Sequence, residues 1–293
     1  MSDQRTAPGE SLFASVGFLI TVLAVGFFVA VQAGIPPAVD VYRWIHQRVD
    51  VSFESLDWNR NGAYVSLGPV TDDLAAAGLI TLTPHPAINA DAVKALLDAI
   101  PAGATGASYA YSPDAFGPRW SDTDQNGCDQ RNDVLARDLT DIRYTPGTHN
   151  CVVSTGTFYD SYADNSGPIS YYRAEELATG TSPAAIDEVV PLRWAWQHGA
   201  NTWSAEQREK FATDFANLQT TQASSLAGKS DQDGPASWLP PAESHAACLY
   251  VTRFTNTVSQ YHLTLDDDDR SAIRHVLDAC TPPRPATPTT PAS

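Results

Sequence analysis

The chain is poor in positive charge. Its 293 residues include 18 Lys and Arg against 34 Asp and Glu, which gives a formal net charge of −16 at pH 7. A surface with this balance repels polyanions unless basic residues gather in a local patch. Tight non-specific binding to nucleic acid is therefore disfavoured.

Long uncharged apolar runs are also scarce, and one near the N-terminus stands out. Residues 12–31 carry no charge, and twenty residues at about 1.5 Å each are enough to cross a hydrocarbon core of about 30 Å. We predict a transmembrane anchor at residues 12–33, after a cytoplasmic segment at residues 1–11. A signal peptide is the alternative, because small residues end the run at Ala33.

Cysteine is scarce as well, and its positions bear on the compartment. All four cysteines (Cys128, Cys151, Cys248 and Cys280) follow the apolar run. An even number is typical of two disulfides in an oxidising compartment. We therefore predict a single-pass protein of the cell membrane whose C-terminal domain is extracytoplasmic.

The rest of the chain is long enough for one main domain with appendages. Strand-like segments at 51–53, 63–67 and 79–82, between turn signals, predict a small juxtamembrane module over residues 34–88. A domain over residues 89–280 follows. Residues 281–293 contain five prolines and are predicted to be a disordered tail.

Within residues 89–280, helical spacing alternates with β-branched segments. The sequence predicts helices at 91–100 and within 127–139, a helix opened by the capping box Ser204–Gln207, and helices at 245–259 and 271–280. Segments 151–159 and 169–172 predict a hairpin.

Several motifs occur in a fixed order along this domain. They are Gly127-Cys-Asp-Gln-Arg-Asn132, Arg137-Asp-Leu139, Cys151-Val-Val153, Asp187-x-Val-Val-Pro-Leu192, Phe211-Ala-Thr-Asp214, Asn217-Leu218 and Trp238-Leu-Pro-Pro241. Over residues 92–280 they resemble the HNH (ββα-metal) endonucleases of the GmrSD C-terminal type. The resemblance implies an α+β fold, with an HNH-like ββα-metal core, added helices and two disulfides. The N-terminal transmembrane helix and the juxtamembrane module would precede it.

The resemblance also assigns site residues. In this family, the first strand supplies a metal-ligand Asp and a general-base His, the second strand an Asn, and the helix a further ligand. Here Asp187 stands at the metal-ligand position and Asn217 matches the middle Asn, but Glu188 replaces the base. Without a gap, Leu226 stands where a ligand Asn is usual. Two positions of the expected site are therefore changed.

These changes matter because the divalent ion stabilises charge on the phosphate, while a neutral imidazole deprotonates the attacking water. Glu188 is the candidate substitute base, although it adds repulsion to an anionic substrate. One gap in the loop would bring Ser224 or Ser225 to the ligand position. Arg131 and Lys229 are the candidate phosphate contacts, and Mg or Mn is the metal required for activity.

Three histidines offer a further substitute for the missing base. They are His198, His245 and His262. His198 lies in a helix-like, Trp-rich stretch and the other two are far along the chain, so ordinary surface or core histidines are the simpler interpretation for each.

The resemblance implies that the cysteines pair as Cys128 with Cys151 and Cys248 with Cys280. Two acidic segments allow metal binding but have simpler interpretations. Asp122-Thr-Asp-Gln-Asn-Gly127 with Asp133 partly fits a calcium loop, and an Asx-rich turn is the alternative. Asp266–Asp269 is the pattern expected at a helix N-terminus, where the dipole favours carboxylates.

Two functions remain open. We favour a catalytically degenerate HNH-like domain, anchored in the membrane by one N-terminal helix and acting as a binding or structural protein with an envelope partner. The alternative is an active metal-dependent nuclease that hydrolyses DNA phosphodiesters with Glu188 as base. DNA is a partner only in the second case.

Overall fold

The computed structural model describes residues 69–81, 87–103, 110–163, 167–174, 182–241 and 244–280. Several predicted features lie outside these ranges. They are the N-terminal segment 1–11, the anchor 12–33, strands 51–53 and 63–67, and the tail 281–293. In the described part of the chain, no helix is both long and apolar enough to cross a membrane.

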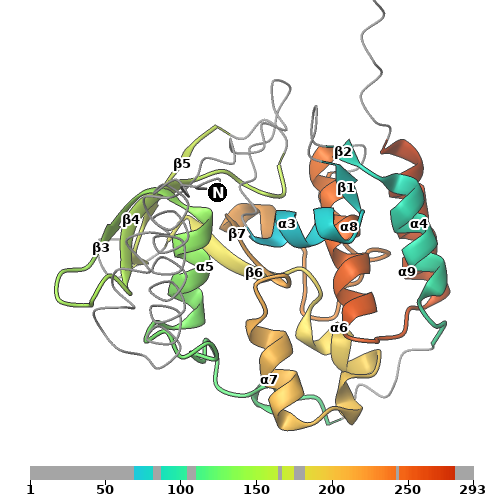
Figure 1. The fold of residues 1–293 in the computed structure, drawn as a ribbon, viewed down its shortest axis with the longest axis horizontal. Helices are drawn as coiled ribbons and strands as arrows, with labels where there is room; N and C mark the ends of the chain where they lie inside the picture. The colour runs from blue at the N-terminus through green and yellow to red at the C-terminus, as the bar shows by residue number, and fades with distance from the viewer. Residues whose placement is uncertain are drawn as a thin grey trace, which may run out of the picture. The chain divides into compact units, whose positions relative to one another are not determined.

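The described residues form a mixed α+β fold, as predicted, and its elements belong to one compact unit (Figure 1). In chain order they are α3 (Pro69–Ala76), β1 (Ile80–Thr81), β2 (Ala87–Ile88), α4 (Ala90–Ala99), η1 (Pro113–Phe116), α5 (Gln130–Asp138), β3 (Thr140–Tyr144), β4 (Val153–Phe158), β5 (Ile169–Tyr172), β6 (Ala184–Glu188), α6 (Leu192–Gln197), η3 (Ala200–Thr202), α7 (Ala205–Thr213), β7 (Leu218–Gln222), η4 (Ala223–Leu226), α8 (His245–Gln260) and α9 (Asp267–Ala279).

The described strands form three antiparallel sheets: β1–β2, β3–β4–β5 and β6–β7. The predicted hairpin is confirmed, because β4 pairs with β5 from Thr155↔Tyr172 to Phe158↔Ile169. Strands β6 and β7 are different, since α6, η3 and α7 lie between them in the chain. Their pairing therefore joins segments that are distant in sequence.

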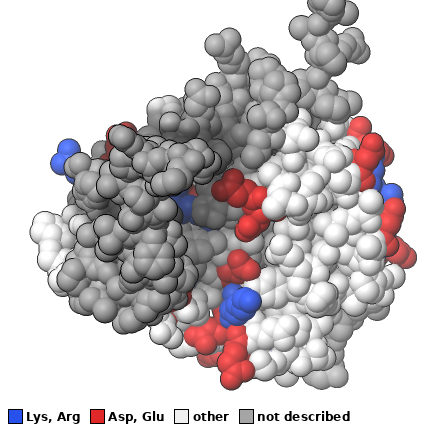
Figure 2. Space-filling view, in the orientation of Figure 1, with Lys and Arg blue, Asp and Glu red and all other residues white. Residues whose placement is uncertain are grey.

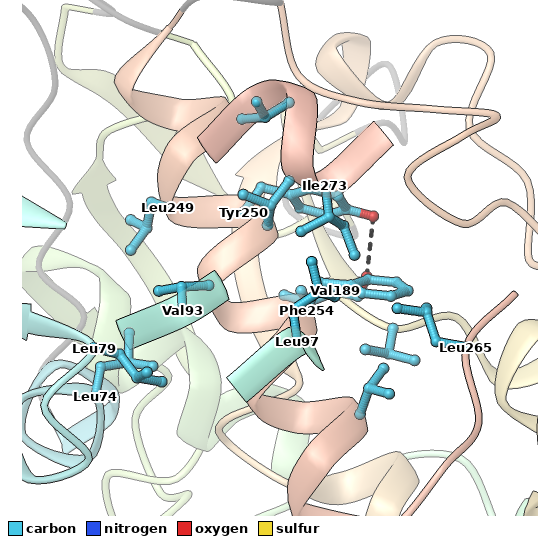
Figure 3. Packing of buried hydrophobic residues seen from close by; sticks show 14 of the residues in the cluster. Leu74, Leu79, Val93, Leu97, Val189, Leu249, Tyr250, Phe254, Leu265 and Ile273 are labelled. Carbon is cyan, nitrogen blue, oxygen red and sulfur yellow. Dashed lines mark hydrogen bonds between the residues drawn. The ribbon is translucent and has the colours of Figure 1, made fainter. Parts of the chain in front are cut away.

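Helices α4 and α9 pack against α8, which is buried on all sides along much of its length. Tyr250 and Phe254 of α8 contact the same core as Val93 and Leu97 of α4, as Figure 3 shows. The Tyr250 hydroxyl donates to the Val189 carbonyl at 3.2 Å, which satisfies its polar end. We call this cluster the helical core.

The helical core continues across the predicted domain boundary at residue 88. Val70 and Leu74 of α3 and Ile80 of β1 belong to it. Helix α3 was not predicted; it is short and begins with Pro69, a residue that suits the first helical position because no intrahelical N–H is needed there. The boundary itself stays a prediction.

A second cluster, the sheet core, lies between α5 and the strands. Val134 and Leu135 of α5 pack with Val153 of β4, and Ile186 of β6 and Leu218 of β7 join them. The residues that follow β6, Val189 and Val190, belong to the helical core instead. The chain therefore passes from the sheet core to the helical core at the end of β6.

Both predicted disulfides are present. Cys128 bonds to Cys151, which ties the turn before α5 to the segment before β4, and Cys248 bonds to Cys280, which ties the first turn of α8 to the end of α9. Each covalent link thus holds elements of a hydrophobic core together.

Replacing Cys248 and Cys280 together by alanine is expected to lower the free energy of unfolding by about 3 to 4 kcal/mol, because the bond closes a loop with a sequence separation of 32 and so restricts the unfolded chain. Urea unfolding of the full chain measures the loss. The Cys128/Cys151 double variant is the comparison, with a slightly smaller loss expected from its separation of 23. Unchanged urea midpoints in both variants would contradict this account.

Candidate functional site

Strand β6 ends in two adjacent acidic residues with different surroundings. Side chains alternate between the two faces of a strand, so Asp187 and Glu188 point to opposite sides. Asp187 lies opposite Gln219 of β7 and is buried, with 7% of its surface exposed. Glu188 lies opposite Leu218 and lines a pocket. Of the pair predicted from the sequence as ligand and base, Glu188 lines this pocket, whereas Asp187 is not among its lining residues.

Asp187 is held by two donors from distant parts of the chain. The Tyr162 hydroxyl and the Lys229 ammonium each donate to Asp187 Oδ2 at 2.5 Å. Lys229 Nζ also donates to the backbone carbonyl of Glu188 at 2.9 Å. Because the Lys229 side chain is only 4% exposed, this is a buried ion pair in which each charge depends on the other.

Three aromatic rings enclose the Lys229 ammonium. Nζ lies 4.9 Å from the ring centre of Trp238, 5.4 Å from that of Tyr250 and 5.5 Å from that of Tyr162, all within the range of cation–π attraction. Burial, and next the charge of Asp187, raises the pKa of both tyrosines well above the ordinary value, so the phenols stay neutral. The ammonium thus sits in an aromatic cage closed by one carboxylate.

Asn217 fixes the junction between β6 and β7. Its side-chain Oδ1 accepts from Val190 N at 2.7 Å, and its Nδ2 donates to Val190 O at 3.1 Å. Its backbone carbonyl accepts from Val189 N at 2.8 Å. Asn217 is fully buried, and its amide is engaged by backbone atoms, so it acts as a positioning residue.

Glu188 opens onto a pocket of about 470 Å³, a size typical of small-molecule sites. Tyr111, Arg119, Trp120 and Asp231 are among the other lining residues. Burial, and next the charge of Asp187, raises the pKa of Glu188, whereas the exposed Arg119 lowers it. A carboxyl shifted in this direction is better suited to proton transfer near neutral pH than an ordinary glutamate.

An ion pair lies beside this pocket. Arg193 Nε is 3.2 Å from Asp231 Oδ2, and its guanidinium lies 4.6 Å above the ring of Tyr111. Burial, and next the charge of Asp231, raises the pKa of Tyr111 to about 12. Both charged side chains are more than one third exposed, so solvent screens this pair.

A match to a family model shows which protein family the chain belongs to. Residues 129–276 match the model described as GmrSD restriction endonucleases, C-terminal domain. The chain belongs to this family. It is also 30% identical over 199 residues to an uncharacterized secreted protein of Arthroderma benhamiae, in an alignment that covers 68% of this chain and 89% of that relative. No solved structure matches it.

The metal that the GmrSD-type resemblance implies does not fit the side chains around Asp187. A hard divalent cation needs several oxygen ligands. Leu226 has no ligating atom, and its side chain packs against the helical core. Among the described residues, Asp187 belongs to no group of three His, Cys, Asp or Glu side chains with converging ligand atoms. Its Oδ2 instead holds Lys229.

The other predicted site residues lie in separate places, apart from Lys229, which lies beside Asp187. Arg131 lies in the first turn of α5, and Lys229 is committed to the buried ion pair. His198 is buried after α6, whereas His245 begins α8 and His262 follows it. The structure therefore brings together Asp187, Glu188 and Lys229 of the predicted set, with Asn217 beside them.

The segment predicted as an alternative calcium loop makes the bonds of a turn that enters a helix. Asp122 Oδ2 accepts from Gly127 N at 2.9 Å, and Asp129 caps α5 by accepting from Asn132 N at 2.8 Å. Gly127 has a φ of 89°, which favours glycine. These contacts fit the Asx-rich turn, and calcium remains a prediction.

Three residues around Asp187 were not predicted from the sequence: Tyr162, Tyr250 and Asp160. The carboxylate of Asp160 is fully buried and accepts from Tyr162 N at 3.1 Å and from the Thr221 hydroxyl at 2.5 Å. It thereby fixes the loop that carries Tyr162 against β7. The available signal was an acidic residue close to tyrosines in a hairpin loop.

Proposed function

We propose that this GmrSD-type domain retains an HNH-like core but has lost metal-dependent phosphodiester hydrolysis, and that it serves as a binding or structural domain, a pseudoenzyme. The observation that carries the proposal is the buried pair of Asp187 with Lys229. The carboxylate that would hold the metal already holds a cation, and Leu226 leaves no second ligand at the expected place.

The strand pairing supports an HNH-like arrangement. Strand β6 carries Asp187, and Asn217 directly precedes its antiparallel partner β7. The short helix η4 follows β7 directly. In this proposal, η4 stands in place of the ββα helix and ends at Leu226. A single 3₁₀ turn is a poorer platform for a ligand than a full helix, since its hydrogen bonds have weaker geometry.

Charge supports the same conclusion. Asp114, Glu188 and Asp231 line the pocket together with Arg119, so acidic side chains outnumber basic ones there. On the face drawn in Figure 2, the described Asp and Glu side chains form clusters, whereas Lys and Arg are scattered. A phosphodiester would meet net repulsion at such a site.

We further propose that the domain works outside the cytoplasm. Two disulfides are typical of oxidising compartments, and the relative from Arthroderma benhamiae is described as secreted. Residues 12–33 would hold the domain at the cell membrane, and an envelope protein would be its partner. A net charge of −16 suits a protein partner better than a nucleic acid.

A second function is favoured by one specific observation. Burial raises the pKa of Glu188, which is the shift a carboxylate needs to act as general base near neutral pH. In this alternative, Glu188 deprotonates water, and Mg or Mn at Asp187 would stabilise charge on the phosphate. That alternative requires Lys229 to release Asp187.

Nicking of supercoiled plasmid separates the two functions. We expect the purified full-length chain with Mg or Mn to nick no faster than Asp187→Ala or Glu188→Gln variants, because the expected base and one expected ligand are missing. Arg193→Met, which changes an exposed charge near the pocket, controls for unspecific effects. Strong cleavage by the wild type that both site variants abolish would establish the nuclease instead.

A further inference from the structure

A buried histidine lies where the end of α6 meets the start of α9, and the β6 site does not use it. His198 is 2% exposed and follows directly after α6. Its ring stacks on that of Trp194, with the centres 3.7 Å apart and the planes at 12°. The stacking fixes the orientation of the imidazole.

Hydrogen bonding determines which nitrogen of His198 is a donor. Nδ1 lies 2.7 Å from the Trp194 carbonyl oxygen, which can only accept, so Nδ1 carries a hydrogen. In the neutral ring, Nε2 then presents a lone pair. Nε2 is buried and has no hydrogen-bond partner among the described residues. It faces Asp266 Oδ2 at 3.5 Å.

A second carboxylate, that of Asp269, converges on the same place. It is 4% exposed and is fixed by two donors, Trp194 Nε1 to Oδ2 and Ala236 N to Oδ1, each at 2.7 Å. A Cβ at position 234 would collide with this carboxylate, so Gly234 leaves the space that it occupies.

Asp266 is the third side chain at this place, and it reaches solvent. Its Oδ1 caps α9 by accepting from Asp269 N at 2.8 Å, which leaves Oδ2 directed at His198. The Asp266 side chain is 30% exposed, whereas that of His198 is 1% exposed. An ion can therefore arrive from solvent on the Asp266 side, and a water can complete its coordination there.

We propose that His198, Asp266 and Asp269 form a zinc site that joins α6 to α9. Their ligand atoms all lie within 4.8 Å of one another. Zinc bonds of about 2.0 to 2.2 Å in a tetrahedron place ligand atoms roughly 3.4 Å apart, close to the 3.5 Å between Nε2 and Oδ2. Three protein ligands and a water complete the four positions.

The surrounding bonds are those of a prepared metal site. A metal-bound histidine commonly donates its other N–H to a backbone carbonyl, as Nδ1 of His198 does to Trp194. The ligand carboxylate of Asp269 is oriented by an indole and a backbone amide in the same way. The preference of helix N-termini for acidic residues explains the presence of Asp266. It does not explain why His198 Nε2, which has no hydrogen-bond partner among the described residues, faces this carboxylate. This site is independent of any activity at β6.

Zinc binding is tested on the full-length chain after removal of metal by a chelator. Zn²⁺ at about 100 times its dissociation constant is expected to raise the melting temperature of the wild type by about 5 °C or more. Titration with Co²⁺ should give the visible absorption bands of a tetrahedral site at one ion per chain. Zn²⁺ should displace Co²⁺ and remove the absorption bands, since both ions bind at the same site.

Asp266→Asn is the decisive variant. Asparagine keeps the oxygen that caps α9 and replaces only the oxygen facing His198, so the fold is retained. We expect at least a ten-fold weaker affinity for Zn²⁺ and loss of the cobalt bands. Asp268→Asn is the matched control, because it removes the same charge from an exposed position in the first turn of α9. It should bind Zn²⁺ as the wild type does.

Three results would overturn the zinc site. The absence of a thermal shift of the wild type with Zn²⁺ would show that His198 and Asp266 only pair with each other. Equal shifts in the wild type and Asp266→Asn would show that zinc binds elsewhere on the acidic surface. Cobalt bands that persist in Asp266→Asn would exclude this carboxylate as a ligand.

Discussion

Replacing Glu188 by His and Leu226 by Asn in the same molecule is expected to produce metal-dependent nicking of supercoiled plasmid, whereas neither change alone suffices. The double variant returns a base to the end of β6 and an oxygen ligand to the end of η4. Asp187 and the junction fixed by Asn217 are already in place, and the metal must displace Lys229 from Asp187 for the reaction to occur. Proton transfer by a positioned base contributes about 10²- to 10⁴-fold, and it acts only on a substrate whose charge the metal stabilises.

The pH profile provides a readout that a general effect on folding would not give. A histidine base must be neutral, so nicking by the double variant should rise with pH through about 6.5. Adding Asp187→Asn to the double variant should abolish the activity, because the metal then loses its carboxylate. A double variant that is folded, binds Mn²⁺ and still does not nick would show that the HNH-like geometry itself is lost.

The helices could be predicted because their signals are local. Apolar spacing predicted α4 and α8, and the capping box predicted the start of α7, where Ser204 does accept from the backbone. The last helix was predicted to begin at Ser271, but α9 begins at Asp267, with Asp266 as its cap. Helix α3 gave no such signal: it is only eight residues long, and its burial depends on contact with the helical core. Tertiary packing therefore determines the helical structure of this segment more than the intrinsic helix propensity of its residues does.

The candidate site was predicted only in part, because its contacts join distant segments. The resemblance to the family identified Asp187 and Glu188 from adjacent positions in one motif. The ion pair of Asp187 with Lys229 and the hydroxyl of Tyr162 depend on three separate segments meeting, which no periodicity encodes. The acidic segment at the start of α9 shows the same limit. Asp266 behaves as a helix cap, but Asp269 is buried against Trp194.

The Asp187–Lys229 pair yields the second large prediction, a loss of stability when one partner is removed. Lys229→Met is expected to lower the free energy of unfolding by about 3 to 5 kcal/mol, because it leaves a buried carboxylate with only the Tyr162 hydroxyl as partner. Methionine keeps the length and apolar character of the side chain within the aromatic cage. The loss of stability therefore comes mainly from the missing positive charge.

The matched controls separate charge from packing. The double variant Asp187→Asn/Lys229→Met removes both charges and should recover most of the lost stability, since replacing a whole buried pair is often close to neutral. Arg193→Met breaks the exposed pair with Asp231 and should cost no more than about 1 kcal/mol. Urea unfolding of the disulfide-intact wild type and of the three variants gives the four free energies. If Lys229→Met costs no more than Arg193→Met, the ammonium is not an internal cation of this site, and Asp187 is free to take a metal as the nuclease alternative requires.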